Sequence, residues 1–287
     1  IMRIVVLGAS GQLGSCLKKV AQERNIQDIS FPSESEGNIL DITLLDTLFT
    51  KEQPQFVINC AAYTAVDKAE DEPEICRLVN RVGAKNIAEV CVKHHAALIH
   101  ISTDFVFKGN VPQLLSETDV AEPENMYGIT KLEGEQDIAA TLPAHFILRT
   151  SWLYSEYANN FVKTMLRLGS ERDQLGVIVD QAGSPTYAID LAGAIFDIID
   201  TNNQSYGIYH YSNEGVTSWF DFAKTIFDLS QAAVTVNPVK TSEYVNKTNR
   251  HAYTVIDKKK KKKEFGIQIP YWRDSLAVCI DRLTVKA

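Results

Sequence analysis

The sequence predicts an α/β protein built on a doubly wound parallel sheet. Strand-like and helix-like segments alternate through the first 150 residues, which is the pattern of βαβ units. The strand-like segments are short apolar runs with β-branched residues, typical of strands that are buried on both faces. A chain of 287 residues with 45% hydrophobic content can also bury a large core, about three quarters of its unfolded surface.

The first unit joins a strand to a helix through a glycine-rich turn. Residues 2–7 form the apolar run, the turn over residues 8–14 reads GASGQLG, and helical periodicity follows. This order is typical of dinucleotide binding, in which backbone N–H groups at the helix start face phosphates. Gly8 permits the tight turn, Gly11 lets the backbone approach a pyrophosphate, and Gly14 allows close packing of helix on strand. We therefore expect a Rossmann-like fold with a bound nucleotide cofactor; a glycine turn without a ligand is the alternative.

The remaining elements follow in order along the chain. In the first half we expect strands near residues 28–31, 56–60, 98–102 and 145–150, and helices over 43–51, 73–95 and around 127–131. In the second half we expect helices near 158–170, 188–200 and 217–229, with short strands at 176–180 and 208–212. Residues 1–150 should form a dinucleotide-binding domain and residues 151–287 a smaller, mainly substrate-binding lobe. Segments near 176–200 and 208–212 should return to the main sheet.

The charge and composition of the chain argue against some classes of binding partner. A net charge of −7 argues against nucleic acid and anionic membranes, and no apolar run approaches the roughly 20 residues that span a bilayer. We expect no signal peptide, and the five cysteines, without CxxC spacing, fit a reducing cytoplasm rather than a disulfide framework or a metal site. The six lysines at 258–263 are expected to form a solvated helix face, with anion or nucleic-acid binding as the alternative.

Tyr127 and Lys131 are the strongest candidates for chemistry. On a helix, residues four apart share a face, so the phenol and the ammonium can address one reaction centre. A neighbouring ammonium favours the phenolate and should bring the tyrosine pKa toward the working range. Thr103 follows another predicted strand and can donate to a carbonyl oxygen, because ligands collect at the carboxyl ends of parallel strands. With a nicotinamide, these three side chains could reduce a ketone or oxidise an alcohol.

Longer strings resemble one enzyme family. They are NCAAYTAVDKAE at 59–70, STDFVFKG at 102–109, RTSWLY at 149–154, NFVKTM at 160–165 and DQAGSPT at 180–186. Together with the glycine turn and the Tyr127-x-x-x-Lys131 pair, they are similar to the dTDP-4-dehydrorhamnose reductases of the extended short-chain dehydrogenase/reductase superfamily. The likeness covers nearly the whole chain, and Phe105 and Lys108 depart from the family's STDYVFDG.

The resemblance implies a reaction and a set of site residues. The reaction is reduction of the C4 ketone of dTDP-4-dehydro-L-rhamnose to dTDP-L-rhamnose by NADPH or NADH, with hydride from the nicotinamide and the proton from Tyr127. The implied catalytic residues are Thr103, Tyr127 and Lys131. The implied cofactor contacts are Gly8, Ser10, Gly11, Gln12, Leu13, Asp41, Ile42, Ala61, Ala62, Tyr63, Tyr127 and Lys131. The implied substrate contacts are Thr103, Asp104, Trp152, Asn160, Gln181, Pro185, Thr186 and Arg250.

Some positions depart from the family pattern. Certain members bind Mg²⁺ at a dimer interface through acidic residues, and Ser15 and Cys16 stand where one of these is expected, which argues against a Mg²⁺-linked dimer. The family's Arg-Pro pair reads Arg250-His251 here, which leaves Arg250 as the phosphate contact. The choice between NADPH and NADH, and between monomer and homodimer, stays open.

Two alternative functions remain at this point. One is a different sugar-nucleotide enzyme of the superfamily, such as an epimerase. A dehydratase fits less well, because it generally needs an acidic pair beside the threonine and Asp104 is followed by Phe105. The other is a non-catalytic, NADP-binding regulatory subunit resembling the β subunit of methionine adenosyltransferase. Retention of the catalytic and substrate motifs together favours the reductase.

Overall fold

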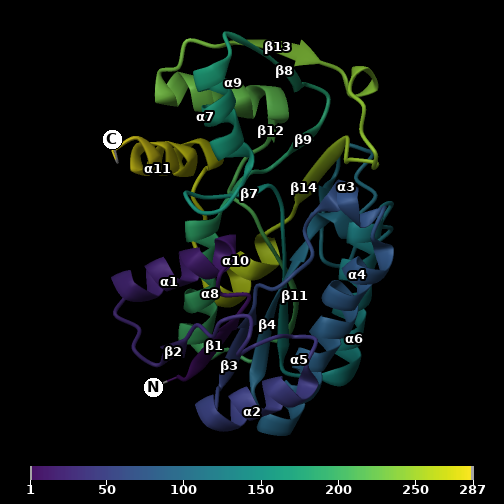
Figure 1. The fold of residues 1–287 in the computed structure, drawn as a ribbon, viewed down its shortest axis with the longest axis vertical. Coiled ribbons are helices and arrows are strands. Elements are labelled where there is room, and N and C mark those ends of the chain that lie inside the picture. Colours follow the sequence, from purple (N-terminus) through teal and green to yellow (C-terminus); the bar gives the residue numbers. More distant parts are fainter. Residues whose placement is uncertain (1, 286–287) are drawn as a thin grey trace.

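A six-stranded parallel sheet forms the centre of the larger part of the molecule (Figure 1). The computed structural model describes residues 2–285. The strand order is β2-β1-β3-β4-β6-β11, and every neighbouring pair is parallel. The strands are β1 (Ile4–Leu7), β2 (Ile29–Ser30), β3 (Phe56–Asn59), β4 (Ala97–Thr103), β6 (His145–Thr150) and β11 (Gly207–Tyr211). The predicted α/β fold with a doubly wound parallel sheet is confirmed.

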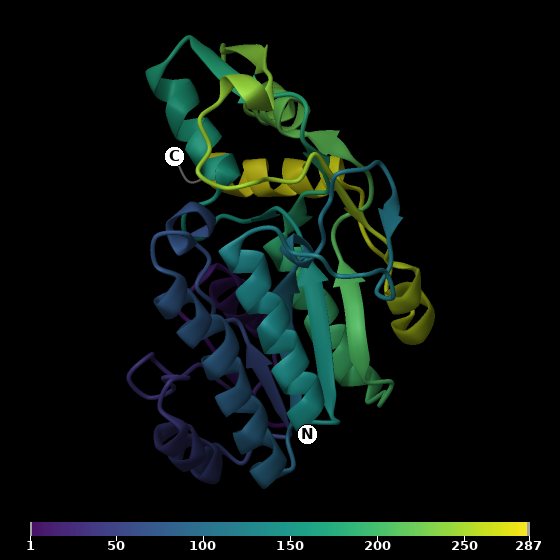
Figure 2. The same cartoon turned by 90° about the vertical axis from the view of Figure 1, so that its right-hand side faces the viewer.

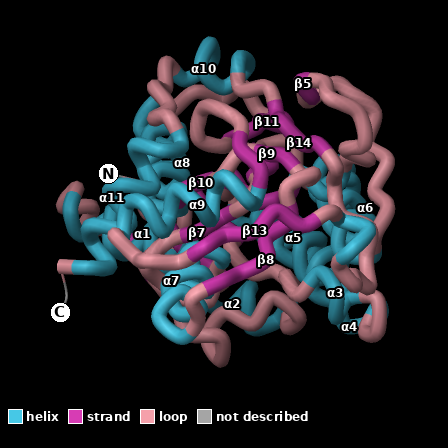
Figure 3. The backbone as a smooth tube through the Cα atoms, turned by 90° about the horizontal axis from the view of Figure 1, so that it is seen from above, coloured by secondary structure: helices cyan, strands magenta, loops and turns pink. Residues whose placement is uncertain are grey.

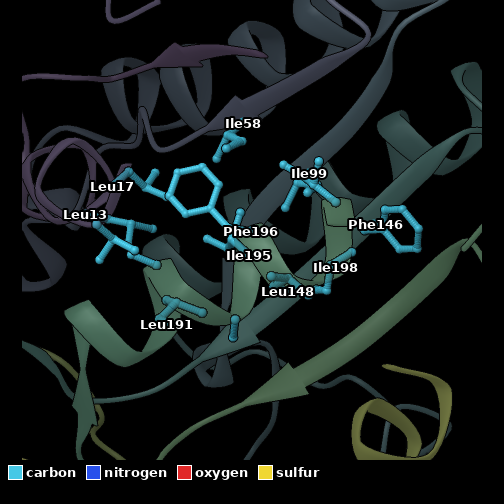
Figure 4. Packing of buried hydrophobic residues seen from close by; sticks show 14 of the residues in the cluster. Leu13, Leu17, Ile58, Ile99, Phe146, Leu148, Leu191, Ile195, Phe196 and Ile198 are labelled. Carbon is cyan, nitrogen blue, oxygen red and sulfur yellow. The ribbon is translucent and has the colours of Figure 1, made fainter. Parts of the chain in front are cut away.

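Helices cover both faces of this sheet. Helices α1 (Gln12–Glu23) and α8 (Ala188–Thr201) pack side by side on one face, while α2 (Ile42–Glu52), α5 (Ala84–His94) and α6 (Met126–Thr141) cover the other. Figure 4 shows the first of these layers, where Leu17 of α1 and Phe196 of α8 lie close to Ile58 of β3. Each large apolar side chain buried in this way contributes about 1.5–3 kcal/mol of transfer free energy.

The strand order reverses between β1 and β3. From β1 the chain passes to β2 on one side, and from β3 it passes to β4 on the other. Gly8, just after β1, has φ +71°, and a Cβ there would lie 2.7 Å from the Cα of Ala61, just after β3. Only glycine fits this approach. A crevice at such a reversal, outside the carboxyl ends of the strands, is where ligands bind in open α/β sheets.

The helix expected over residues 73–95 is continuous but not uniform. It consists of α4 (Pro73–Arg77), a π-helical turn η1 (Leu78–Gly83) and α5. In the π-helical turn, Asn80 faces the loop after β3: its Oδ1 accepts from the Tyr63 N–H at 2.8 Å and its Nδ2 donates to Tyr63 O at 3.1 Å. Such π turns occur frequently at functional sites.

Four helices begin at polar side chains that accept a hydrogen bond from a backbone N–H in the first turn. The acceptors are Asp41 for α2, Asn125 for α6, Asn160 for α7 and Ser218 for α9. Caps of this kind are each worth about 1 kcal/mol and fix where a helix starts. Asp41 and Asn160, which are also predicted ligand contacts, therefore have structural roles.

A smaller lobe lies at the carboxyl end of the sheet (Figures 1 and 2). Its helices are α7 (Phe161–Glu171), α9 (Trp219–Ser230) and α11 (Trp272–Thr284). Its strands form three small sheets: β8 (Gln174–Ile178) with β13 (Thr235–Val239), β7 (Leu153–Tyr154) with β10 (Thr186–Tyr187), and β12 (Thr217–Ser218), β9 (Ala182–Gly183), β14 (Tyr253–Ile256) and β5 (Leu114–Leu115) in that order. The short helices α3 (Val66–Ala69) and α10 (Lys259–Phe265), with the 3₁₀ turns η2 (Asp104–Val106) and η3 (Thr241–Glu243), complete the described chain.

The segments expected to return to the main sheet behave differently from one another. Strand β11 lies at the edge of that sheet, and α8 packs on its face. The strand expected near residues 176–180 does not return, because β8 pairs with β13 within the lobe (Figure 3). Its exposed and buried residues alternate, which is the pattern of a sheet with one covered face rather than of a central parallel strand. No helix within residues 2–285 is long and apolar enough to cross a bilayer.

The prediction that the six lysines form a solvated helix face is wrong for two of them. Lys258 is 7% exposed, and its Nζ donates to Ser212 Oγ at 3.0 Å. Lys261 is fully buried: its Nζ lies 3.7 Å from the ring centroid of Tyr211 and has no hydrogen-bond partner among the described residues. Helix α10 packs against β11, so residue 261 faces the sheet edge and its alkyl stem fills an apolar position. Burial lowers the pKa of Lys261 well below its usual range.

Lys261→Leu should therefore stabilise the fold. Removing a buried amine that lacks an acceptor should raise the free energy of unfolding by about 1–3 kcal/mol near pH 7. Because burial lowers the pKa of Lys261 well below its ordinary value, the folded chain gives up this proton at a lower pH than the unfolded chain, and wild-type stability rises as pH approaches the ordinary lysine value of about 10.4. The advantage of leucine should accordingly shrink by pH 10. Urea unfolding at both pH values measures this, with the exposed Lys263→Leu as control; equal shifts in the two variants would contradict the assignment.

Candidate active site

The first turn of α6 lies directly against the end of β4. Asn125 caps the helix by accepting from Gly128 N–H at 2.8 Å, and a Cβ at Gly128 would overlap the carbonyl oxygen of Phe105. Only glycine permits this approach, which brings Tyr127 beside Thr103. The Thr103 hydroxyl lies close enough to lower the pKa of the Tyr127 phenol. The structure thus brings the two predicted proton-handling residues together.

The environment of Tyr127 favours the protonated phenol. Burial raises the pKa of Tyr127 above its usual value, the nearby Thr103 hydroxyl partly lowers it, and the charge of Asp104 raises it further. The expected lowering by Lys131 is wrong, because the Lys131 ammonium donates instead to Ile101 O at 2.6 Å and burial outweighs its influence. A protonated phenol is the form required of a proton donor to a ketone oxygen.

Lys131 is a buried titratable group of this site. It is 2% exposed, and burial lowers its pKa to about 8, while the Glu135 carboxylate one helical turn later partly opposes the shift. At neutral pH most of the population therefore remains an ammonium, held between strand β4 and helix α6.

A buried ion pair lies next to Lys131. Glu135 Oε2 accepts from Ser102 Oγ at 2.6 Å, and its Oε1 accepts from Arg149 Nη2 at 2.7 Å. Both charged side chains are at most 3% exposed, and the guanidinium also lies 5.1 Å from the ring centroid of Phe107. This network joins α6 to β4 and β6. Sequence reasoning missed it, although Glu135 follows Lys131 by four residues and so shares its helix face.

Thr103 and Asp104 form a connected pair at the strand end. Thr103 Oγ1 accepts from Phe105 N–H at 3.1 Å and donates to Asp104 Oδ1 at 3.3 Å. Asp104 is 2% exposed, and its Oδ2 has no hydrogen-bond partner among residues 2–285. The Thr103 proton that we expected to face a ketone is thus engaged, through a long bond, with Asp104.

The glycine turn has the geometry of a phosphate site. Gly11 caps α1, whose first turn carries no acidic residue, and a Cβ at Gly14 would lie 2.5 Å from Ala9 O. Ser10 is exposed, and the buried side chain of Leu13 packs in the core, so that residue can offer a ligand only its backbone. Free N–H groups at a helix start without nearby carboxylates favour an anion.

The loop after β3 continues the wall of the same crevice. Asn59 Oδ1 accepts from Ala61 N–H at 3.0 Å, and Ala62 is half-buried. The Tyr63 hydroxyl donates to Glu72 at 2.7 Å, and burial together with this bond raises the pKa of Tyr63 to about 12. At the other end of the crevice, Asp41 and Ile42 are exposed at the start of α2.

Gln12 joins the crevice to the lobe. Its Oε1 accepts from Asn160 Nδ2 at 3.2 Å and from Ser155 Oγ at 2.9 Å. Ser15 donates to Gly11 O at 2.8 Å, and burial raises the pKa of the Cys16 thiol to about 12. Among residues 2–285, no group of three or more His, Cys, Asp or Glu side chains is placed to hold a metal ion.

Trp152 belongs to an aromatic stack in the lobe. It has φ +47°, and its ring lies parallel to that of Trp219 with centroids 3.5 Å apart. A Cβ at Gly183 would lie 2.8 Å from the Trp152 ring, so β9 packs closely against it. Trp219 was missed in the sequence, because it is a lone aromatic at the start of an ordinary amphipathic helix.

The remaining predicted substrate residues are separated. Gln181, Pro185 and Thr186 are buried in the lobe; Gln181 Nε2 donates to Thr241 Oγ1 at 3.2 Å, whereas Thr186 Oγ1 has no partner in the described chain. Arg250 lies nearer the catalytic end: its guanidinium is 5.9 Å from the Phe105 ring centroid and donates to Asp67 of α3 at 3.0 Å.

Known proteins share this sequence and architecture. The family described as RmlD substrate binding domain matches residues 2–285. The dTDP-4-dehydrorhamnose reductase of Aggregatibacter actinomycetemcomitans is 40% identical over 284 residues, which is 96% of this chain and 97% of the relative.

Solved structures agree with the sequence match. A dTDP-4-dehydrorhamnose reductase from Clostridium acetobutylicum superposes with a TM-score of 0.94 at 38% identity, covering 98% of this chain and 99% of that one. The Bacillus anthracis dTDP-4-dehydrorhamnose reductase in complex with NADP gives a TM-score of 0.93 at 38% identity, covering 100% and 99%. The chain therefore belongs to the RmlD substrate-binding domain family, that of the dTDP-4-dehydrorhamnose reductases.

Proposed function

We propose that this protein reduces the C4 ketone of dTDP-4-dehydro-L-rhamnose to dTDP-L-rhamnose, with NADPH or NADH as the hydride donor. The observation that carries this proposal is the protonated Tyr127 phenol beside Thr103 at the end of β4, one helical turn before Lys131. The identity to curated dTDP-4-dehydrorhamnose reductases over nearly the full chain supports the choice of substrate.

The crevice between β1 and β3 fits a dinucleotide. The backbone at Gly8, Ser10, Gly11, Gln12 and Leu13 would hold the pyrophosphate, since a Cβ at Gly8 would fill the turn and no acidic side chain lies in the first turn of α1. Asp41 and Ile42 would lie beside the adenine, and Ala61, Ala62 and Tyr63 along the nucleotide. The NADP complex of the Bacillus anthracis relative makes NADPH the first cofactor to test.

The bound nicotinamide would supply the hydride, and side chains of this chain would manage the proton. Tyr127 gives its phenolic proton to the C4 oxygen as negative charge develops there. Thr103 polarises that oxygen by turning its hydroxyl proton away from the long bond to Asp104. The Lys131 ammonium holds the nicotinamide ribose and stabilises the phenolate that remains on Tyr127.

Residues 151–287 would supply most contacts to the sugar nucleotide, facing the dinucleotide-binding residues 1–150. Trp152 and Asn160 would face the sugar or the adjacent phosphate, with Asp104 on the opposite side. Gln181, Pro185 and Thr186 would shape the nucleotide pocket, and Arg250 would bind phosphate after leaving Asp67. We further propose that the enzyme is cytoplasmic, because all five cysteines are free thiols and four of them are buried. We propose that it is a monomer or a homodimer.

Tyr127→Phe should abolish most turnover and preserve the cofactor site. Loss of one acid–base group should lower kcat by a factor on the order of 10²–10⁴. The assay follows NADPH absorbance at 340 nm with dTDP-4-dehydrorhamnose generated in situ, while cofactor fluorescence reports binding. Near-normal turnover in the variant would remove Tyr127 from the reaction. A wild-type protein that binds NADPH without oxidising it would indicate a regulatory or differently specific member.

The affinity for NADPH should fall at alkaline pH. Since burial lowers the pKa of Lys131 to about 8, the ammonium is lost as pH rises through that value. If the ammonium holds the ribose, the dissociation constant should rise by up to about tenfold per pH unit above 8. Fluorescence titration between pH 6.5 and 9.5 measures this, with Lys131→Met as the comparison. If the dissociation constant began to rise at the same pH in the wild type and in Lys131→Met, another group would be responsible.

A further inference from the structure

His251 stands where the resembling family has proline, and it lies one aromatic ring away from the catalytic tyrosine. Its ring centroid is 4.6 Å from that of Phe105, and the Phe105 centroid is 5.6 Å from that of Tyr127 in an edge-on contact. A Cβ at Gly109 would lie 2.6 Å from the imidazole, so the loop after η2 encloses it. The His251 side chain is 10% exposed.

The contacts of the imidazole assign its protons. His251 Nε2 lies 2.8 Å from Phe107 O, and because a carbonyl only accepts, Nε2 carries a hydrogen in every protonation state. In the neutral ring, Nδ1 accepts from Thr254 Oγ1 at 3.1 Å. In the imidazolium, Nδ1 becomes a donor, and Asp104 Oδ2 lies 3.5 Å away.

Asp104 Oδ2 is the acceptor for the Nδ1 proton of the imidazolium. It is buried and has no hydrogen-bond partner among the described residues, which is a costly state for a carboxylate. The other oxygen of the same carboxyl accepts from Thr103, and the carboxyl charge also opposes ionisation of Tyr127. The charge on Asp104 therefore acts on both residues that face the reacting ketone.

Other charged groups around His251 have partners of their own. Arg250, on the same segment, is paired with Asp67 of α3. Lys108, on the enclosing loop, lies 4.0 Å from Glu124. Of the charged side chains near the imidazole, Asp104 is the one with an oxygen left unpartnered in the described chain.

We propose that His251 is a positioning residue of this active site, whose imidazolium pairs with Asp104 and thereby releases the Thr103 proton to the substrate ketone. When His251 is neutral, the unpaired carboxylate retains the Thr103 hydroxyl and makes proton release from Tyr127 less favourable. Turnover should thus be highest while His251 is protonated and should decline as it loses its proton. The proposal rests on the proposed ketone reduction.

The pH dependence of kcat at saturating NADPH tests this role. Wild-type kcat should decline with rising pH by a factor on the order of 3 to 10, in a step that His251→Gln lacks. His251→Gln keeps an N–H for Phe107 O but carries no charge, so its kcat should be low and flat over that interval. His251→Lys stays charged, so at neutral pH its kcat should match the kcat that the wild type reaches only at acidic pH. His95→Gln, at an exposed helix end, should keep the wild-type profile.

A measurement without turnover separates the two proposals. In ¹H–¹⁵N spectra at pH 5.5, wild-type His251 should show a slowly exchanging Nδ1 proton, and Asp104→Asn should lose it. Superimposable kcat profiles for wild type and His251→Gln, or an unchanged Nδ1 signal in Asp104→Asn, would overturn the positioning role. A protected Nδ1 proton in a protein that reduces no substrate would leave the pair intact and remove the proposed function.

Discussion

The catalytic end of the sheet depends on the buried ion pair between Glu135 and Arg149. Through Ser102 it ties α6 to β4 and β6, and so fixes the height of Lys131 and Tyr127 relative to Thr103. Each charge is satisfied by at least one short hydrogen bond, which offsets the desolvation that burial imposes. Removing one partner of such a pair generally costs about 3–5 kcal/mol. Here the same loss would also shift the proposed catalytic residues, so stability and the proposed chemistry share one interaction.

Among the polar contacts that connect the lobe to the nucleotide-binding part, two groups involve predicted ligand residues. In one, Gln12 of the glycine turn accepts from Asn160 and Ser155; in the other, Asp67 of α3 binds Arg250 and Thr248. Both connections include predicted ligand contacts, namely Gln12 and Asn160 at the first and Arg250 at the second. Contacts of this polar kind can be exchanged for ligand contacts at low cost, whereas the apolar cores on either side cannot.

Sequence patterns were sufficient for some parts of the site and misleading for others. The glycine turn and the Tyr127-x-x-x-Lys131 spacing predicted a strand-to-helix turn and a shared helix face, because both are local patterns with a fixed backbone consequence. The predicted lowering of the Tyr127 pKa was wrong, because this pKa depends on burial and on where the Lys131 ammonium lies. Trp219 gave no signal, as its partner Trp152 is far away in the chain. The ligand roles stay predictions.

The sequence by itself determined the α/β class, the positions of the central strands along the chain and the family, because hydrophobic periodicity and glycine positions are read along the chain. The tertiary structure decided what depends on neighbours distant in sequence. It placed β8 in the lobe, buried Lys261 over Tyr211 and set His251 against Asp104. The sequence pattern had pointed to the main sheet for the first and to solvent for the second, and it gave no partner for His251. The free energy of a charged or polar side chain is set by the groups that surround it after folding, and those groups come from other segments.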